Sequence, residues 1–298
     1  MLEPSGSAEL EHIDIQTNAV RLHTVQAGPK NGRLLVFLHG FPEYWYGWRG
    51  QIDFFAARGW RVVAPDQRGY NLSDKPRGVW QYQVEHLAAD VDGLIRGMGR
   101  DKACLVGHDW GAAVAWETAI RYPQRLEKLA ILNVPHPDVM TRFLLSDRVQ
   151  LRKSWYIFFF QIPGLPELLL RSNHFAGLRR MMRASGNEGS FSEADLDQYT
   201  SAWSQPGALS AMINWYRAVF RRSLSGPKKP ADIPVRRVNV PVLILWGKKD
   251  IALSAEMVQP SLDLCGASKR AVFYENASHW VQHDEANAVN RELEIHLS

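Results

Sequence analysis

Short apolar runs alternate with longer amphipathic segments along most of the chain. The runs are nearly continuous in aliphatic residues, which is typical of strands buried on both faces of a parallel sheet. They lie at 34–38, 60–64, 103–106, 129–132, 242–246 and 271–274. Segments with helical periodicity lie at 83–98, 111–122, 255–264 and 285–297. This alternation predicts an α/β fold with a mostly parallel central sheet flanked by helices.

The first part of the chain has a different pattern. Residues 12–16 and 20–25 are strand-like, and the three residues 17–19 between them are typical of a turn. We therefore expect an antiparallel hairpin at one edge of the sheet.

The alternation stops after Leu132, and about 100 residues pass before it resumes at Val242. A connection of that length is too long for a loop inside a compact domain. It contains helical periodicity at 138–160, 165–182, 193–203 and 208–222. We interpret residues 137–231 as a helical cap (lid) subdomain inserted into a core domain made of 1–136 and 232–298.

Composition excludes several classes of protein. The 35 basic and 31 acidic residues are spread along the chain, which argues against a nucleic-acid partner. The two cysteines have no metal-ligand spacing, and no phosphate-binding glycine loop occurs in a strand-to-helix context, so we expect no metal and no cofactor. The longest strongly apolar run, 155–160, is far shorter than the about 20 residues of a membrane span.

The N-terminal residues 1–7 have neither a basic leader nor an apolar core, so they do not resemble a signal peptide. Together with the low cysteine content, this favours a cytoplasmic protein. The sequence leaves open whether the chain is a monomer or a homodimer.

The segment Val106-Gly107-His108-Asp109-Trp110-Gly111 follows a predicted strand and opens a predicted helix. This is the context of a nucleophile elbow, with aspartate in the central position. The two glycines permit a tight turn that presents Asp109 at the carboxyl end of the sheet. Taken alone, the segment is equally a turn in which Asp109 caps the helix.

Two further residues favour the catalytic interpretation. Asp250 follows the strand-like run 242–246, and His279 follows the run 271–274, which gives the chain order nucleophile, acid, base of an α/β-hydrolase triad. His283 is the alternative base, but we expect it in the final helix with a surface or cap role. The other location for the acid, after Leu132, holds Asn133, which carries no negative charge.

With these residues in place, the chain resembles the cofactor-independent epoxide hydrolases of the α/β-hydrolase superfamily, from about Ile13 to its end. The family motif is matched by His39-Gly40-Phe41-Pro42-Glu43. The resemblance implies that the backbone N–H groups of Phe41 and Trp110 form the oxyanion hole, and that the Phe41-Pro42 bond is cis.

The resemblance also implies two substrate-binding tyrosines. The run from Trp155 to Gly164 looks like the family segment that holds the first, which corresponds to Tyr156. The run Asn214-Trp215-Tyr216-Arg217 looks like the segment that holds the second, Tyr216. Without the triad, both tyrosines would be interpreted as core aromatics.

The implied reaction converts a small hydrophobic or aryl epoxide and water to a vicinal diol. Asp109 forms a covalent alkyl ester, and water activated by His279 with Asp250 hydrolyses it. One alternative is a haloalkane dehalogenase with the same triad, which the apolar Phe41 and the two cap tyrosines disfavour. The other is a noncatalytic protein on the same scaffold that binds hydrophobic ligands.

Three further features are expected to have no catalytic role. Residues 66–70 match a family loop but are expected to form a solvent-facing turn. Trp45, Trp48 and Trp60 are interpreted as packing residues, and His39 as a brace for the oxyanion loop.

Overall fold

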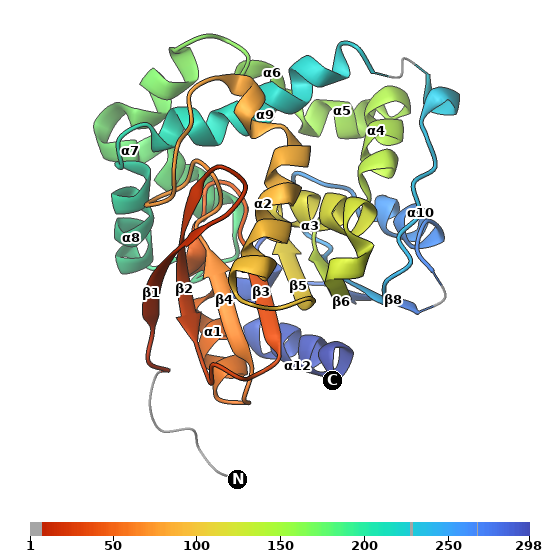
Figure 1. Ribbon diagram of the computed structural model, residues 1–298. Helices are drawn as coiled ribbons and strands as arrows, with labels where there is room; N and C mark the ends of the chain where they lie inside the picture. The colour runs from red at the N-terminus through yellow and green to blue at the C-terminus, as the bar shows by residue number, and fades with distance from the viewer. Residues whose placement is uncertain (1–7, 227–228, 267) are drawn as a thin grey trace.

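The structure, a computed structural model, describes residues 8–226, 229–266 and 268–298. An eight-stranded sheet runs through it in the order β1-β2-β4-β3-β5-β6-β7-β8 (Figure 1). β1 pairs antiparallel with β2, β2 pairs antiparallel with β4, and every other neighbouring pair is parallel. The strands are β1 (Glu11–Gln16), β2 (Arg21–Ala27), β3 (Leu34–Leu38), β4 (Arg61–Pro65), β5 (Ala103–His108), β6 (Leu126–Leu132), β7 (Val242–Gly247) and β8 (Lys269–Tyr274).

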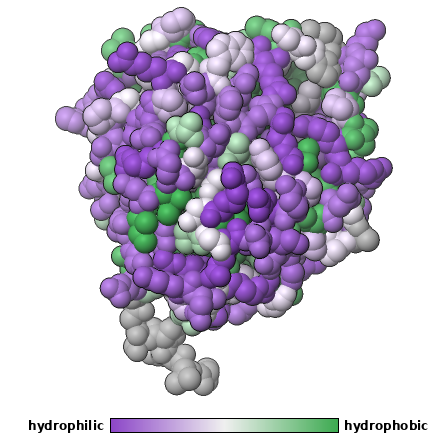
Figure 2. All heavy atoms as spheres, viewed as in Figure 1, coloured by the Kyte–Doolittle hydropathy of each residue, from purple (hydrophilic) through white to green (hydrophobic). Residues whose placement is uncertain are grey.

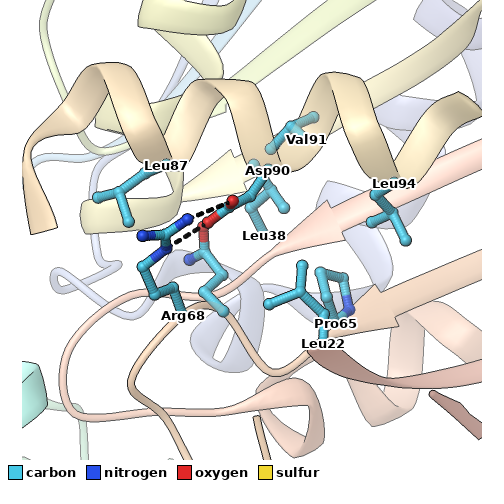
Figure 3. Close-up of a pocket in the computed structure, with 9 residues that line it drawn as sticks. Leu22, Leu38, Pro65, Arg68, Leu87, Asp90, Val91 and Leu94 are labelled. Carbon is cyan, nitrogen blue, oxygen red and sulfur yellow. Dashed lines mark hydrogen bonds and ion pairs between the residues drawn. The ribbon is translucent and has the colours of Figure 1, made fainter. Parts of the chain in front are cut away.

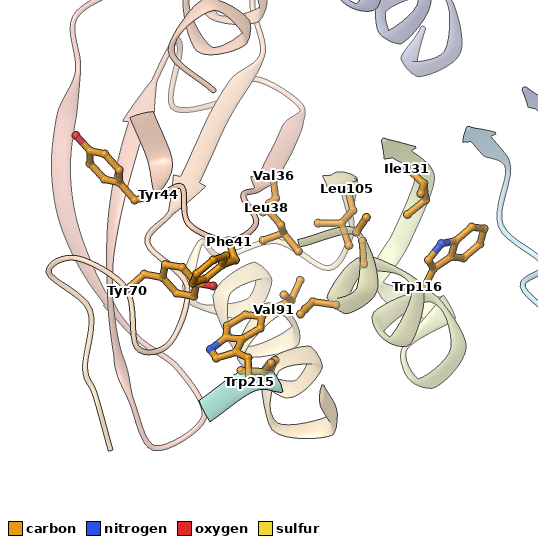
Figure 4. Close-up of a cluster of buried hydrophobic side chains, with 14 of the residues drawn as sticks. Val36, Leu38, Phe41, Tyr44, Tyr70, Val91, Leu105, Trp116, Ile131 and Trp215 are labelled. Atoms are coloured by element: carbon orange, nitrogen blue, oxygen red, sulfur yellow. The ribbon is translucent and has the colours of Figure 1, made fainter. Parts of the chain in front are cut away.

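The predicted fold class, the parallel strands and the edge hairpin are confirmed. The two faces of β3 show why the strands are continuously apolar. Val36 and Leu38 pack with α2 (Val84–Gly97) and α3 (Trp110–Arg121) on one face. Leu35 and Phe37 pack with α1 (Arg49–Ala56) and α12 (Ala286–Leu297) on the other. Figure 4 shows part of the first cluster, in which Val36, Leu38, Leu105 and Ile131 of three strands gather with Val91 and Trp116.

The helices of the core differ from the prediction in three places. α1 was not predicted, because its eight residues offer only a short apolar pattern, yet Ile52 and Phe55 are fully buried. The segment 255–264 is a 3₁₀ turn, Ala255–Met257, followed by α10 (Val258–Asp263). The last turn before the final helix forms a separate short helix, α11 (Val281–Asp284).

Six helices lie between β6 and β7, and Figure 1 shows them gathered at the upper end of the molecule. We call them the inserted helices: α4 (Pro137–Ser146), α5 (Arg148–Lys153), α6 (Trp155–Phe159), α7 (Leu165–Ser185), α8 (Glu193–Trp203) and α9 (Ala208–Ser223). The division into a core domain and a cap remains a prediction.

The helical segment expected at 138–160 is broken into three short helices. Asp147 interrupts it, because its side chain accepts hydrogen bonds from the backbone N–H groups of Val149 and Gln150 and so starts α5. α7 is also interrupted, since Asn173, His174 and Phe175 have left-handed backbone angles.

The loop 66–70 is buried, contrary to the expected solvent-facing turn. Arg68 forms a two-pronged ion pair with Asp90 of α2, with N–O distances of 2.8 and 2.7 Å (Figure 3). Asp66 accepts a hydrogen bond from the His23 ring at 2.7 Å. A charged loop is buried here because each charge has a partner from a distant part of the chain.

The structure also bears on the expected packing tryptophans, on membrane spans and on metal sites. Trp48 is buried, and Trp45 and Trp60 pack against buried clusters, as predicted. Among the described helices, none is long and apolar enough to cross a membrane. The same residues contain no group of three or more side chains that could hold a metal ion. Residues 1–7, on which the expectation about a signal peptide rests, lie outside the described residues.

Candidate active site

Asp109 occupies the turn between β5 and α3, with φ 50° and ψ −125°. This backbone conformation is rare for a residue with a side chain and is found preferentially at functional sites. Two glycines allow the close packing around it. A Cβ atom on Gly40 would lie 2.3 Å from the Cβ of Asp109, and one on Gly111 would lie 2.1 Å from the carbonyl oxygen of Leu38. The turn therefore requires glycine at both positions.

The other two predicted triad residues lie beside Asp109. His279 Nδ1 is 2.7 Å from Asp250 Oδ2, and His279 Nε2 is 3.5 Å from Asp109 Oδ2. Asp250 follows β7 and His279 follows β8, so the three side chains come from the carboxyl ends of parallel strands in one sheet. The structure thus brings together all three residues of the predicted triad.

The charges of this cluster stabilise each other. Burial lowers the pKa of His279, but the negative charges of Asp250 and Asp109 and the hydrogen bonds to them outweigh it and raise this pKa to about 10. Burial raises the pKa of Asp250, but the charge of His279 and the hydrogen bonds to the carboxylate lower it below its ordinary value. The imidazole is therefore held in its protonated form while both carboxylates are charged.

Asp250 is held by more than His279. Its Oδ1 accepts hydrogen bonds from the backbone N–H groups of Ala252 and Leu253 at 2.7 and 2.9 Å. Its Oδ2 accepts a further bond from the side-chain amide of Asn133 at 2.8 Å. The side-chain carbonyl oxygen of Asn133, Oδ1, accepts a hydrogen bond from the backbone N–H of Gly247 at 2.9 Å. Asn133 is not the acid, but it fixes the acid in place.

One of the two backbone groups proposed for the oxyanion hole contacts the carboxylate of Asp109. The N–H of Phe41 donates to Asp109 Oδ1 at 2.7 Å. Trp110 is the first residue of α3, where helix N–H groups have no intrahelical acceptor. The Phe41-Pro42 bond is cis, as the resemblance implied. His39 braces this loop as expected, since its Nε2 accepts the backbone N–H of Gln67 at 3.0 Å.

Both predicted tyrosines come from inserted helices, and their rings contact each other. The rings of Tyr156 in α6 and Tyr216 in α9 are 5.7 Å apart and nearly perpendicular. The Tyr216 ring also contacts those of Phe41 and Trp110, at centroid distances of 5.4 and 5.0 Å. The structure therefore brings the two tyrosines to the residues of the predicted oxyanion hole.

The environment keeps both phenols protonated. Burial raises the pKa of Tyr156, and the negative charge of Asp109 raises it further. Burial and the charge of Asp109 likewise raise the pKa of Tyr216 well above its ordinary value, although a hydrogen bond with Trp110 opposes them. Each hydroxyl therefore retains its proton near a carboxylate and can serve as a hydrogen-bond donor.

Glu43, the last residue of the matched motif, forms a buried network that the sequence interpretation missed. Its carboxylate accepts the Tyr199 hydroxyl of α8 at 2.6 Å and the Gln282 side-chain amide at 3.0 Å. His283 Nε2 lies 2.8 Å from the same carboxylate. His283 is thus buried and paired, which corrects the expected surface position. The only signal in the sequence is an acidic residue within an aromatic stretch.

This network reaches the triad through His108. His108 Nε2 is 2.8 Å from the backbone carbonyl of His279, and its Nδ1 is 3.1 Å from the Gln282 side-chain amide. The partners assign the ring proton to Nε2, which donates to the carbonyl, and leave Nδ1 as the acceptor. Glu43 is therefore connected to the backbone of His279 through two side chains.

Comparisons with known proteins agree with this arrangement. Residues 33–286 match the family model of the α/β-hydrolase fold. The chain is 43% identical to the AB hydrolase superfamily protein YfhM of Bacillus subtilis, over 93% of this chain and 94% of the relative. It is 40% identical to epoxide hydrolase 1 of Caenorhabditis elegans, over 95% of this chain and 69% of the relative. The chain belongs to the epoxide hydrolase family of the α/β-hydrolase fold.

Solved structures of this family have the same architecture. The crystal structure of Bacillus megaterium epoxide hydrolase in complex with an inhibitor superimposes with a TM-score of 0.87 and 33% sequence identity. The match covers 96% of this chain and 99% of that protein. Membership in the epoxide hydrolase family makes the chain a hydrolase.

Proposed function

We propose that the chain hydrolyses epoxides to vicinal diols through a covalent ester on Asp109. The observation that supports the proposal is a pair of buried tyrosines whose rings contact each other and whose pKa values are both raised by burial and by the charge of Asp109. A strained ether needs a nucleophile on one side of its carbon and a proton donor at its oxygen. Asp109 supplies the nucleophile, and the two tyrosines supply the proton donor.

In the first step, one carboxylate oxygen of Asp109 attacks an epoxide carbon and the carbon–oxygen bond of the ring breaks. The attacking atom is Oδ2, because Oδ1 is already held by the N–H of Phe41. The proton of Tyr156 or Tyr216 neutralises the departing ring oxygen. The product of this step is a hydroxyalkyl ester of Asp109.

In the second step, water adds to the carbonyl carbon of Asp109 and gives its proton to His279. Ester formation removes the negative charge of Asp109, which is one of the charges that raise the pKa of His279. The imidazole then gives its proton, through solvent, to the tyrosinate formed in the first step, and serves as a base oriented by Asp250. The N–H groups of Phe41 and Trp110 stabilise the oxyanion, which collapses to release the diol.

The same geometry supports a cap made of residues 137–231 on a core made of 1–136 and 232–298. The inserted helices supply the tyrosines, and the sheet supplies the triad. An aromatic wall of this kind suits a small hydrophobic or aryl epoxide.

The two alternatives are less well supported. A dehalogenase would use the indole N–H of Trp110 to hold a halide, whereas here Trp110 is hydrogen-bonded with Tyr216. A noncatalytic binding protein has no need of a complete triad with the hydrogen bonds seen at Asp250.

The test compares the wild-type chain with Asp109→Asn, supplied with styrene oxide or with a primary bromoalkane. We expect diol from the epoxide, no halide from the bromoalkane, and no diol from the variant. Tyr156→Phe and Tyr216→Phe should each lower the rate of ester formation by about 100-fold. Tyr44→Phe is the matched control, because its hydroxyl makes only a 3.5 Å contact with Gln198, outside the site. Halide release without diol would contradict the proposal, as would binding of styrene oxide without turnover.

A further inference from the structure

The inserted helices expose a cluster of large apolar side chains next to the candidate site. We call it the apolar patch, and it comprises Trp155, Phe158, Ile162, Leu165, Leu168 and Leu169. Trp155 is 64% exposed, Phe158 51% and Leu168 68%. All six belong to one continuous stretch that includes α6 and the first turns of α7. Exposed apolar clusters of this kind mark interaction surfaces.

The polar anchors of this stretch all lie on its inner side. Arg217 of α9 is buried and donates to the carbonyl oxygens of Phe160 and Ile162 at 2.8 and 3.1 Å. It also forms an ion pair with Glu167 at 2.6 Å. On the same side the rings of Phe158 and Phe220 are 5.6 Å apart. These contacts fix the backbone of the stretch on its inner side, while the apolar side chains of the patch remain exposed to solvent.

Basic residues flank the patch on both sides in the sequence. Residues 154–166 carry no charge, whereas 142–171 as a whole contain five basic residues and two acidic ones. Both acidic residues are engaged, Asp147 at the start of α5 and Glu167 with Arg217. The exposed Arg148, Arg152 and Arg171 have no ion-pair partner among the described residues. We call these three exposed arginines, which flank the patch in the sequence, the arginine rim.

We propose that the apolar patch and its arginine rim form a docking surface for anionic lipid membranes. An apolar centre with an arginine rim matches an anionic bilayer surface, because the side chains enter the acyl boundary and the arginines meet the headgroups. Tryptophan is well suited to that boundary. A second copy of the chain fits less well, because a symmetric interface would place the same arginines against one another.

Exposed apolar residues also occur elsewhere on the molecule. Figure 2 shows a mostly hydrophilic face with hydrophobic residues in small groups, several of them along its upper margin, where Figure 1 places the inserted helices. Ile295 is 67% exposed and belongs to α12, a helix that lies near the lower end of the molecule in Figure 1. It provides a control of similar exposure away from the proposed surface.

The test is co-sedimentation of the full chain with vesicles of phosphatidylcholine alone or enriched in phosphatidylglycerol, at low and high salt. We expect binding to the anionic vesicles that weakens with salt. Trp155→Ser combined with Phe158→Ser should weaken binding about tenfold or more. Arg152→Gln and Arg171→Gln should each weaken it about fivefold. Ile295→Ser should bind like the wild type, and circular dichroism should show that all variants are folded.

Three results would overturn the proposal. The first is no binding to anionic vesicles at low salt, and the second is binding that the double patch variant leaves unchanged. The third is a dimer, measured by sedimentation equilibrium without lipid, that the double patch variant dissociates, since the patch would then be covered by a second copy. None of these measurements uses turnover, so they are independent of the proposed reaction.

Discussion

The two walls of the candidate site are built by different physical means. On the sheet side, Asp109, Asp250 and His279 are held by hydrogen bonds of 2.7 to 2.9 Å and by their mutual charges. On the side of the inserted helices, Tyr156 and Tyr216 are positioned mainly by contacts between aromatic rings. The sheet wall is polar and fully bonded, whereas the helical wall is apolar and close-packed.

This difference follows from what each wall has to hold. A buried charge is stable only when it is paired and hydrogen-bonded, so the triad needs its network of backbone and side-chain partners. The tyrosine rings are held mainly by packing, and the Tyr216 hydroxyl, which accepts the indole N–H of Trp110, still has its own proton to donate to a ligand. The sheet wall should therefore determine whether the reaction occurs, and the helical wall should determine what is bound.

The largest effect is expected from His279→Gln, which removes the base of the sheet wall and leaves the helical wall intact. Attack by Asp109 does not need the base, but hydrolysis of the ester does. Turnover should fall by about 10⁴-fold, and mass spectrometry should find one substrate attached per protein chain. Asp109→Asn is the control and should carry no adduct. Loss of turnover without an adduct would place His279 in the first step instead.

The elements of the fold were predictable because their signals are local. The structure has a strand at each of the continuous apolar runs, and all of these strands except the edge strand β8 are largely buried. Helix boundaries in the inserted region were less predictable, since a single residue such as Asp147 ends a helix that the apolar pattern continues through. α1 was missed because its helical signal covers only eight residues.

The residues of the candidate site also differ in how well the sequence indicates their positions. Asp109, Asp250 and His279 each follow a strand, so the order of strands in the sequence indicates that they meet. Asn133 also follows a strand, β6, but nothing in the sequence indicates that it binds Asp250, and nothing indicates the partners of Glu43. Tyr199 is 156 residues from Glu43, and Asp250 is 117 residues from Asn133. Only the folded chain shows that these residues hold the site together.

Glu43 is where the two walls are joined, because it binds Tyr199 of an inserted helix and His283 beside the triad. Glu43→Gln removes a buried carboxylate that accepts hydrogen bonds from Tyr199, Gln282 and His283, and should lower the free energy of unfolding by about 3 kcal/mol in urea denaturation at neutral pH. Glu127→Gln removes a half-exposed pair with Arg33 and should cost less than about 1 kcal/mol. Equal losses in the two variants would contradict a joining role for Glu43.

The pH dependence of the stability lost in Glu43→Gln provides a second test of the role of Glu43. Burial raises the pKa of Glu43, but the charge of His283 and the hydrogen bonds that the carboxylate accepts outweigh it and bring this pKa well below 4.5. A carboxylate with a depressed pKa contributes stability that is present above its ordinary value and is lost as pH falls through the folded value. The difference between wild type and Glu43→Gln should therefore narrow below pH 4.5. A difference that stays constant down to acid unfolding would show that the charge of Glu43 contributes little.

The smallest effect is expected at Asn133, which supports the sheet wall without touching the reacting atoms. Its backbone is left-handed, with φ 54°, so glycine is tolerated there while alanine is strained. Asn133→Gly should cost about 1 to 2 kcal/mol of stability for the lost bonds to Asp250 and Gly247. Asn133→Ala should cost about 1 kcal/mol more, because it adds the backbone strain. Thermal unfolding of both variants separates the two contributions. If glycine restored wild-type stability, the hydrogen bonds to Asp250 would be dispensable, and the backbone alone would explain the asparagine.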